Sequence, residues 1–512
     1  MEEKFILSID QGTTGTTAQI AEVSDMDDLK VVGRSTINFP QHFPKSDWVE
    51  HDLEEIWGSV VQAVKEACAQ AETQAPLFKR QNIVAIGITN QRETLCIYER
   101  KSLKPLCRAI VWQCKRSSSI CQMIKQDGIE KNIRKKTGLL VDPYFTGTKI
   151  RWVMENNPEI ARSIKNGTAV IGTIDTYLIS KLGKGKDHAT EASNASRTLI
   201  YNIEKGGWDD ELIQVMGLPN KDALPEIKNS ADLFTRTKGL DFLPDEIPIT
   251  GVLGDQQAAL AGQRCFSFGE AKCTYGTGAF LLLNIGDKPL LSKQHLLTTV
   301  AWQLDGKQTY ALEGSSFIAG AAFQFLRDKL GFLTSAWESE SLARGAVAAP
   351  EVYFVPALAG LGAPWWEPEA RGAFLGLTRA TTREQLIRAS LEGVAFQVCD
   401  LIESMKGDYR QPFHVLRVDG GAAANSLLME IQAQLAEIRV ERPANLETTG
   451  MGAILFAGLG AKIFDSVETL KKSIGVHSSF EPSVSKRNSE WIQKQKEGWV
   501  RAVKAVRLFS ES

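Results

Sequence analysis

Two short turns rich in glycine and threonine carry the first chemistry that the sequence indicates. Residues 10–16, Asp-Gln-Gly-Thr-Thr-Gly-Thr, follow the strand-prone run 4–9, and residues 275–279, Tyr-Gly-Thr-Gly-Ala, lead into the apolar run 280–285. Glycine permits a tight turn and a close approach of the backbone, and threonine adds a hydroxyl beside free backbone N–H groups. These groups suit phosphate oxygens. One such turn in each half of the chain therefore predicts two related lobes that grip a polyphosphate.

Polar residues follow four of the predicted strands, at Asp10, 90–93, 255–257 and 419–421. Ligands of open α/β sheets bind outside the carboxyl ends of the strands, although a single Asp there is most often a cap. Asp255 is the best candidate for a general base, because it follows an apolar strand and opens an Ala-rich predicted helix. A carboxylate there can accept the proton of a hydroxyl that attacks a γ-phosphate. Asp10, beside the first turn, suits Mg²⁺, which keeps much of its water shell.

Arg92 and Glu93 place charged donors beside charged acceptors. A carbohydrate hydroxyl both donates and accepts hydrogen bonds, so this pair can bind one or two hydroxyls. An isolated pair of this kind is more often a salt bridge in a loop. Trp112 ends the predicted strand 109–111, where its indole either walls the carbon side of a polyol or belongs to the core.

The bulk properties narrow the class of protein. A chain of 512 residues exceeds the size at which one core stops growing, which predicts two large domains. The charge is near neutral, with 59 basic and 61 acidic residues, and this argues against a nucleic-acid partner. The eight cysteines show no zinc spacing, so we expect reduced thiols. The start of the chain lacks signal-peptide character, and the longest apolar stretch, 452–464, is too short for a membrane span of about 20 residues. We therefore expect a cytoplasmic protein without a transmembrane segment.

Strand-like and helix-like periods alternate along the chain, which favours an α/β architecture. The clearest elements are a helix over 53–71 behind the cap Asp52, a buried strand over 83–89 and a helix over 383–405. The last segment, 471–512, is charged and helix-prone. No Walker A sequence occurs, which excludes a P-loop nucleotide site. No complete GxGxxG lies between a strand and a helix, which disfavours a Rossmann dehydrogenase.

The paired turns, together with Val-Asp-Gly-Gly at 418–421, resemble the superfamily of sugar kinases, Hsp70 and actin. Within it, the chain is similar to the glycerol kinases, a branch of the FGGY carbohydrate kinases, in five segments that occur in the same order: 90–94, 110–114, 142–145, 254–260 and 360–364. The resemblance implies an α/β fold of two related actin-like ATPase (ribonuclease H-like) domains, at 1–256 and 257–512, with the active site in the cleft between them. It also implies the ATP-dependent phosphorylation of glycerol to sn-glycerol 3-phosphate, the first step of glycerol catabolism.

The resemblance assigns roles to individual residues of this chain. The glycerol-binding residues it implies are Arg92, Glu93, Trp112, Tyr144, Asp255, Gln256 and Phe280, with Asp255 as the general base. Those implied for ATP or ADP are Thr13, Thr14, Gly15, Thr277, Gly320, Gln324, Gly421 and Asn425. Mg²⁺ would be served by Asp10 and Asp255. The substrates would be glycerol and ATP, and the enzyme would assemble as a homodimer or homotetramer.

Two departures and two alternatives stay open. The chain has Thr17 where glycerol kinases often carry an arginine, so the phosphates there are held more weakly or by another cation. The segment 237–246 is Gly-poor and acidic compared with the loop that binds fructose 1,6-bisphosphate in some bacterial members, and we do not expect that regulation. The alternatives are an FGGY kinase for another polyol or sugar, and a non-catalytic, actin-type ATP-binding protein. The compact set of Arg92, Glu93 and Trp112 favours a small triol, and the presence of Asp255 argues against the non-catalytic protein.

Overall fold

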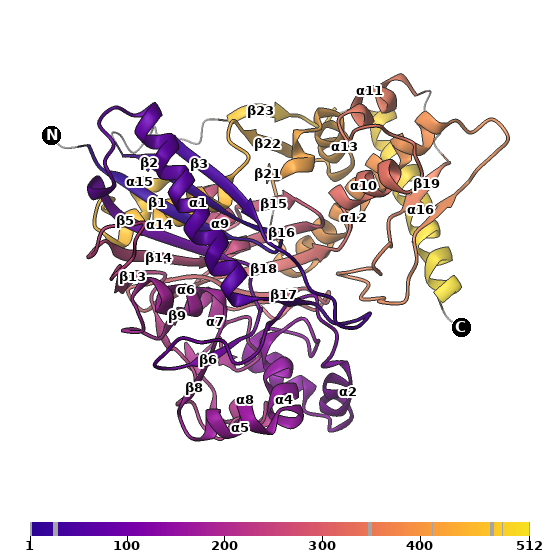
Figure 1. Cartoon of the computed structure of the whole chain (residues 1–512). Helices are drawn as coiled ribbons and strands as arrows, with labels where there is room; N and C mark the ends of the chain where they lie inside the picture. The colour runs from indigo at the N-terminus through magenta and orange to yellow at the C-terminus, as the bar shows by residue number, and fades with distance from the viewer. Residues whose placement is uncertain are drawn as a thin grey trace.

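The computed structural model describes residues 3–23, 29–346, 351–411, 413–471, 476–483 and 485–510. Two large mixed sheets lie next to each other, and most of the segment between β5 and β13 lies below them in the view of Figure 1. The chain is thus α/β with two lobes, as the alternation of periods predicts. In the described part of the chain, no helix combines the length and the apolar character that a membrane span requires.

The first sheet orders its strands β13-β14-β5-β1-β2-β3. In this sheet β1, β5 and β14 run parallel to one another, and the remaining neighbours pair antiparallel. The strands are β1 Phe5–Gln11, β2 Gly15–Glu22, β3 Lys30–Asn38, β5 Ile83–Asn90, β13 Ala231–Arg236 and β14 Pro248–Gly254.

The second sheet orders its strands β17-β18-β16-β15-β21-β22-β23. Its strands are β15 Ala271–Tyr275, β16 Ala279–Gly286, β17 Leu297–Leu304, β18 Lys307–Ser316, β21 Val415–Asp419, β22 Arg439–Pro443 and β23 Val476–Phe480. From β18 to β23 the strand directions repeat those of the first sheet from β3 to β13, including the two parallel pairs in the middle. The two glycine-threonine turns occupy equivalent places, between β1 and β2 and between β15 and β16. The prediction of two related lobes is therefore confirmed.

Two helices rich in alanine or glycine pack tightly where the lobes meet. They are α9 Asp255–Gly262 and α14 Thr448–Gly460. Helix α14 comes from the second half of the chain but packs on β1, β5 and β14 of the first sheet, while α9 contacts β15 and β16 of the second. A Cβ atom on Gly452 would lie 1.8 Å from the carbonyl oxygen of Ala258, so only glycine permits this contact.

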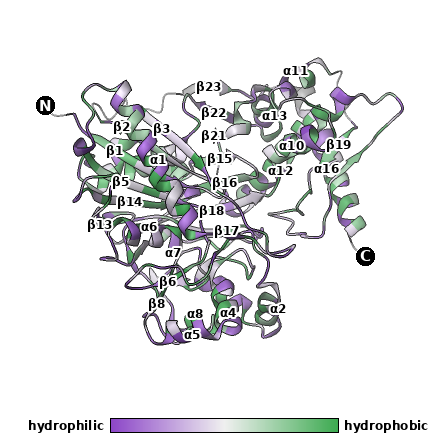
Figure 2. Cartoon of the chain, in the orientation of Figure 1, coloured by the Kyte–Doolittle hydropathy of each residue, from purple (hydrophilic) through white to green (hydrophobic). Residues whose placement is uncertain are grey.

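Other helices cover the sheets or build the part between β5 and β13. Helix α1 shows why these elements form: the carboxylate of Asp52 accepts from the backbone N–H of Glu54 at 2.8 Å, and the apolar side of the helix is buried. Figure 2 shows the hydrophobic residues along strands such as β1, β5 and β14 and residues of both kinds on α1. The helices are α1 Leu53–Gln74, α2 Ser118–Gln126, α3 Glu130–Thr137, α4 Thr146–Asn156, α5 Pro158–Lys165, α6 Ile174–Leu182, α7 Ala192–Ala195, α8 Asp210–Val215, α10 Gly320–Asp328, α11 Glu338–Gly345, α12 Arg383–Tyr409, α13 Ser426–Ala436, α15 Val467–Leu470 and α16 Lys486–Ser510.

Short strands complete the fold. They are β4 Glu50–His51, β6 Cys96–Glu99, β7 Ala109–Ile110, β8 Ala169–Gly172, β9 Ala189–Glu191, β10 Tyr201–Asn202, β11 Gly207–Trp208, β12 Glu226–Lys228, β19 Tyr353–Val355 and β20 Ala373–Leu375. The helix predicted from 53 runs on to Gln74, and the strand predicted over 83–89 is β5. The final segment is only partly helical, because β23 precedes α16 and adds a strand to the edge of the second sheet.

Candidate active site between the two sheets

Three parallel strands of the first sheet end side by side. Gln11 of β1 pairs with Asn90 of β5, and Asn90 pairs with Gly254 of β14. The residues next to these ends, among them Asp10, Arg92 and Asp255, therefore gather at one edge of the sheet. This is the edge at which ligands of α/β folds bind, and the sequence predicts the same grouping.

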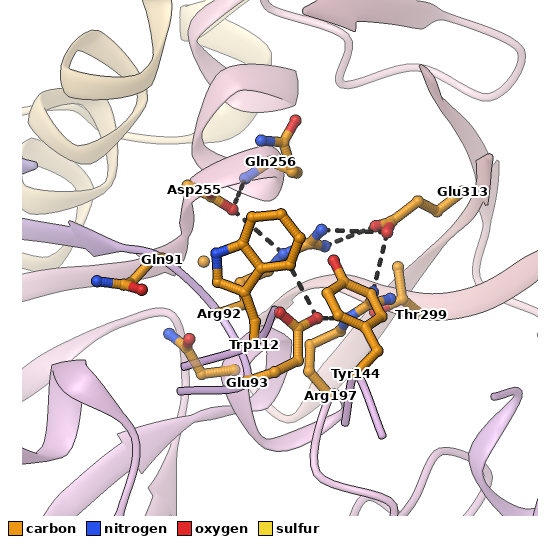
Figure 3. Close-up of polar contacts among 12 residues, drawn as sticks. Gln91, Arg92, Glu93, Trp112, Tyr144, Arg197, Asp255, Gln256, Thr299 and Glu313 are labelled. Carbon is orange, nitrogen blue, oxygen red and sulfur yellow. Dashed lines mark hydrogen bonds and ion pairs between the residues drawn. The ribbon is translucent and has the colours of Figure 1, made fainter. Parts of the chain in front are cut away.

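Arg92 joins this edge to the second sheet (Figure 3). Its Nε lies 3.2 Å from Oδ1 of Asp255, and its Nη1 donates to Oε2 of Glu313 at 2.6 Å. Glu313 lies on β18 of the second sheet. Burial raises the pKa of Glu313, but the guanidinium groups of Arg197 and Arg92 outweigh this effect and lower the pKa to about 2. The carboxylate is therefore ionised throughout the neutral pH range.

Arg197 completes a buried ring of four charges with Arg92, Glu93 and Glu313. Its Nε donates to Glu93 at 2.6 Å and its Nη2 donates to Glu313 at 2.9 Å. The four side chains are each at most 2% exposed, and the two positive charges match the two negative ones. Among the described residues, Nη1 of Arg197 has no hydrogen-bond partner. Such a ring costs desolvation energy, and it is stable only while the charges stay paired.

The backbone at Glu93 is held in an unusual conformation. Its φ is +61°, in the left-handed region that favours glycine, and positions of this kind cluster at active sites. The surrounding contacts fix it: the carbonyl of Glu93 accepts from the hydroxyl of Thr146 at 3.1 Å, and Asn90 exchanges side-chain hydrogen bonds with Asn194 of α7. Helix α7 ends just before Arg197, so this amide pair also positions Arg197.

Two aromatic rings lie beside the charged ring, as Figure 3 shows. The indole of Trp112 meets the ring of Tyr144 edge to face, with 5.6 Å between the centroids. The indole Nε1 donates to Oγ1 of Thr13 at 3.0 Å. Trp112 therefore does more than fill the core, because it contacts both the first glycine-threonine turn and Tyr144 beside the charged ring.

Asp255 differs from its neighbours in exposure. Its side chain is 29% exposed, whereas the side chain of Arg92 is 2% exposed. Its Oδ1 accepts from the backbone N–H of Gln256 at 2.7 Å, which fixes the carboxylate at the start of α9. A fixed, reachable carboxylate beside a buried donor can accept a proton from a bound hydroxyl.

Lys272 is a functional candidate that sequence reasoning missed. It is fully buried on β15, and its Nζ donates to Oε1 of Gln256 at 2.6 Å and to Oγ1 of Thr274 at 2.8 Å. Burial lowers the pKa of this amine. Phe280 of β16 pairs with Thr274 and shares its face of the sheet, which places Phe280 on the side of Gln256.

The residues expected to bind the nucleotide lie on both turns and on elements packed against the second turn. In the first turn, the N–H of Gly12 donates to the carbonyl of Gly15 at 2.9 Å. In the second, the carbonyl of Gly276 accepts from the N–H of Gly320 at 2.9 Å, which brings the start of α10 onto the turn. Gln324 lies one helical turn further along α10 and is exposed. Asn425 caps α13, and space is open around Gly421. The remaining members of the set, Thr13 and Thr14, belong to the first turn.

Asp10 is the candidate residue for a cation. Burial, followed by the charges of Asp255 and Glu447, raises its pKa to about 8, and the charge of Arg34 opposes the shift. Carboxylates that repel one another fit a hard divalent cation such as Mg²⁺. Within the described ranges, no three acidic, histidine or cysteine side chains approach closely enough to hold a metal by themselves. That Asp10 serves Mg²⁺ through water stays a prediction.

Comparisons with known proteins place this geometry in a family. Residues 5–262 match the N-terminal domain of the FGGY family of carbohydrate kinases, and residues 271–461 match its C-terminal domain. The chain is 48% identical over 502 residues to the glycerol kinase of Myxococcus xanthus, which covers 98% of this chain and 99% of that protein. It is 46% identical over 507 residues to the glycerol kinase of Staphylococcus haemolyticus, with 99% of each covered.

Solved structures agree with the sequence comparisons. The crystal structure of Plasmodium falciparum glycerol kinase with ADP has a TM-score of 0.89 and 36% identity, and 98% of each chain is covered. The gluconate kinase of Lactobacillus acidophilus has a TM-score of 0.86 at 20% identity, which is a likeness of fold alone. The resemblance and the fold class inferred from the sequence are confirmed.

Proposed function

We propose, since the chain belongs to the FGGY family of carbohydrate kinases, that it transfers the γ-phosphate of ATP to a terminal hydroxyl of glycerol and releases sn-glycerol 3-phosphate. The observation that carries this proposal is the cluster in which Arg92 contacts both Glu93 and Asp255, with the indole of Trp112 beside it. The full-length likeness to glycerol kinases supports the choice of glycerol within the family.

The pocket suits a small triol. Arg92 and Glu93 offer donors and acceptors to neighbouring hydroxyls, and Tyr144 and Gln256 add further polar groups at the edge. Trp112 and Phe280 would face the carbon chain. Arg92 is already paired with Glu313, and Glu93 with Arg197, so both side chains are oriented before glycerol arrives, which lowers the ordering cost of binding.

Asp255 is the proposed base. Its free carboxylate oxygen accepts the proton of the terminal hydroxyl while that oxygen forms a bond to the γ-phosphorus, and the bond from the γ-phosphorus to the bridging oxygen of ADP breaks. The Nε of Arg92 holds the other oxygen of this carboxylate, Oδ1, in place. Mg²⁺, held through water by Asp10 and Asp255, would neutralise charge on the phosphate oxygens.

The nucleotide would span both turns. Thr13, Thr14 and Gly15 are proposed to bind the terminal phosphates with their backbone N–H groups and hydroxyls. A second set is proposed to hold the rest of the nucleotide from the other sheet: Thr277, Gly320, Gln324, Gly421 and Asn425. This division assigns residues 1–256 to a polyol-binding domain and residues 257–512 to a nucleotide-binding domain.

Because the reaction consumes ATP, we propose a cytoplasmic enzyme. We also propose that it assembles from two or four copies, which light scattering after gel filtration tests.

A coupled assay of ADP release tests the proposed function. The enzyme with Mg-ATP is offered glycerol, dihydroxyacetone, xylulose and gluconate at several concentrations. We expect the highest kcat/KM with glycerol. A higher kcat/KM with xylulose or gluconate would assign the chain to another branch of the family. ADP release that none of these compounds stimulates would instead favour a non-catalytic ATP-binding protein.

A further inference from the structure

An exposed ion pair lies where the first sheet meets the start of α14. The guanidinium of Arg34, on β3, donates to Glu447 at 2.7 Å, across 413 positions of sequence. The two side chains are 44% and 43% exposed. An exposed pair of this kind contributes about 0–1 kcal/mol, so an exchange of partners costs little.

The strand register places Arg34 near the first glycine-threonine turn. Asp10 of β1 pairs with Thr17 of β2. Two residues away along the strands, Gln19 of β2 pairs with Ser8 on one side and with Arg34 of β3 on the other. Residues paired across strands share a face, and so do residues two apart on one strand. Asp10, Thr17 and Arg34 therefore lie on the same face of the first sheet.

That face is the one covered by α14, because a Cβ atom on Gly450 would lie 2.7 Å from Oε1 of Gln19. Adjacent rows on one face are about 7 Å apart along the strands. An extended arginine side chain spans a similar length, so the guanidinium of Arg34 can reach the row of Asp10 and Thr17. This row leads directly into the turn at Gly12.

The charges at the turn call for a cation. Asp10 and Asp255 bring two acidic side chains to this edge of the sheet, where the negatively charged phosphates are proposed to bind. Thr17 has a neutral side chain, and its hydroxyl is hydrogen-bonded to the hydroxyl of Thr36 at 2.9 Å.

Two other cations near the site are held by buried partners. Arg92 is paired with Glu313, and Lys272 holds Gln256, both in buried contacts. Arg34 differs from them because it is exposed and its carboxylate partner is exposed as well. Of these three cations, Arg34 is therefore the one that can exchange its carboxylate partner for a ligand.

We infer that Arg34 binds the phosphates of the nucleotide at the first turn, and that its guanidinium is paired with Glu447 until the nucleotide binds. The inference rests on the proposed function only for the identity of the nucleotide. Phosphate oxygens carry more charge than one carboxylate, and a planar guanidinium binds two of them at once. Glu447 is then a competitor of the nucleotide for the same cation.

Competition gives the two partners opposite effects, which a purely structural ion pair cannot do. Binding of Mg-ADP is measured by calorimetry at fixed ionic strength for the wild type, Arg34→Met and Glu447→Gln. We expect Arg34→Met to weaken binding by about 10- to 100-fold, the usual range for a charge-assisted contact. We expect Glu447→Gln to bind Mg-ADP more tightly than the wild type, and Arg34→Lys to recover part of the loss.

The matched control is Arg236→Met. Arg236 is also a strand arginine of the first sheet, 43% exposed and paired with an exposed glutamate, but it lies on the edge strand β13. Its replacement should leave Mg-ADP binding unchanged. Equal weakening by Arg34→Met and Glu447→Gln, or unchanged binding in Arg34→Met, would overturn the inference.

The assay of glycerol-stimulated ADP release is run on the same samples. A wild type that binds Mg-ADP but does not respond to glycerol would refute the proposed function and leave the binding result for Arg34 standing. Arg34→Met should keep the wild-type affinity for glycerol, measured by calorimetry, because Arg34 is paired with Glu447 and is not one of the proposed glycerol-binding residues. A Tm of Arg34→Met within a few degrees of the wild type shows that the variant is folded.

Discussion

The Nε of Arg92 lies 3.2 Å from Oδ1 of Asp255, and the same guanidinium is bound through Nη1 to a glutamate of the opposite sheet. The proposed base is thus fixed by a cation that is itself anchored across the two lobes. This arrangement makes the position of Asp255 depend on both sheets.

Asp255→Asn should bind glycerol normally and lose turnover by about 10²- to 10⁴-fold, the usual contribution of a general base. The amide keeps the shape of the side chain but cannot accept the proton. Glycerol affinity from calorimetry and kcat from the coupled assay separate the two effects. The control is Trp112→Phe, which keeps the base and removes the indole N–H, and should change KM for glycerol more than kcat. A kcat near wild type in Asp255→Asn would remove Asp255 from the role of base.

Glu313→Gln should lower the free energy of unfolding by about 3–5 kcal/mol, because it leaves two buried guanidinium groups with one carboxylate. Urea unfolding measures this change. We also expect a higher KM for glycerol, since Arg92 loses its anchor. The control is Asp328→Asn, which removes one half of an exposed ion pair with Arg327 and should not change stability measurably. Equal stability of the two variants would show that the ring does not stabilise the fold.

Gly452→Ala should destabilise the protein by about 1–3 kcal/mol, because the added methyl group overlaps the carbonyl of Ala258 where α14 meets α9. Gly58→Ala is the opposite case. Gly58 lies inside α1 with open space around it, and alanine there should stabilise the helix by about 0.5–1 kcal/mol. Thermal unfolding shows whether each variant has a lower or a higher Tm than the wild type. A Gly452→Ala variant as stable as the wild type would mean that the two helices separate easily.

Asp400→Asn should remove a pH dependence of stability. The carboxylate of Asp400 accepts from the indole N–H of Trp365 at 3.1 Å and of Trp499 at 2.9 Å, and burial raises its pKa from 3.8 to about 7. The folded protein therefore holds this proton more tightly than the unfolded chain. It loses stability as the pH rises from about 4 to about 7, by up to about 4 kcal/mol.

The asparagine at this position can still accept the indole N–H groups and has no proton to lose. The difference in Tm between Asp400→Asn and the wild type should therefore be small near pH 5 and should grow toward pH 8 in favour of the variant. A difference that stays constant over this range would show that Asp400 titrates alike in both states.

The sequence predicts the parts of the site that lie at strand ends, because a polar residue directly after an apolar strand is visible in one short window. Asp10, Arg92 and Asp255 are found in this way, and the register of β1, β5 and β14 brings them together. The nucleotide residues Gly320, Gln324 and Asn425 have no such signal, because in sequence they are ordinary helix positions. They come from the family resemblance, and their roles stay predictions.

Arg197 and Glu313 show what sequence reasoning missed. They lie 104 and 221 positions from the residues that they bind, Glu93 and Arg92 respectively, and only the tertiary fold joins them. A weak signal was present in both Glu313 and Lys272, because each is a lone charged residue inside an apolar strand. A charge in such a place has to find a buried partner, and in this fold the partners are active-site side chains.

The identity of the phosphorylated product tests the central claim most directly. Glycerol and Mg-ATP are incubated with the enzyme, and the product is measured with a dehydrogenase specific for sn-glycerol 3-phosphate and by total organic phosphate. The account predicts that the two amounts are equal, because the asymmetric pocket presents one terminal hydroxyl to Asp255. A product that is only half consumed by the dehydrogenase, or the absence of any phosphorylated glycerol, would contradict it.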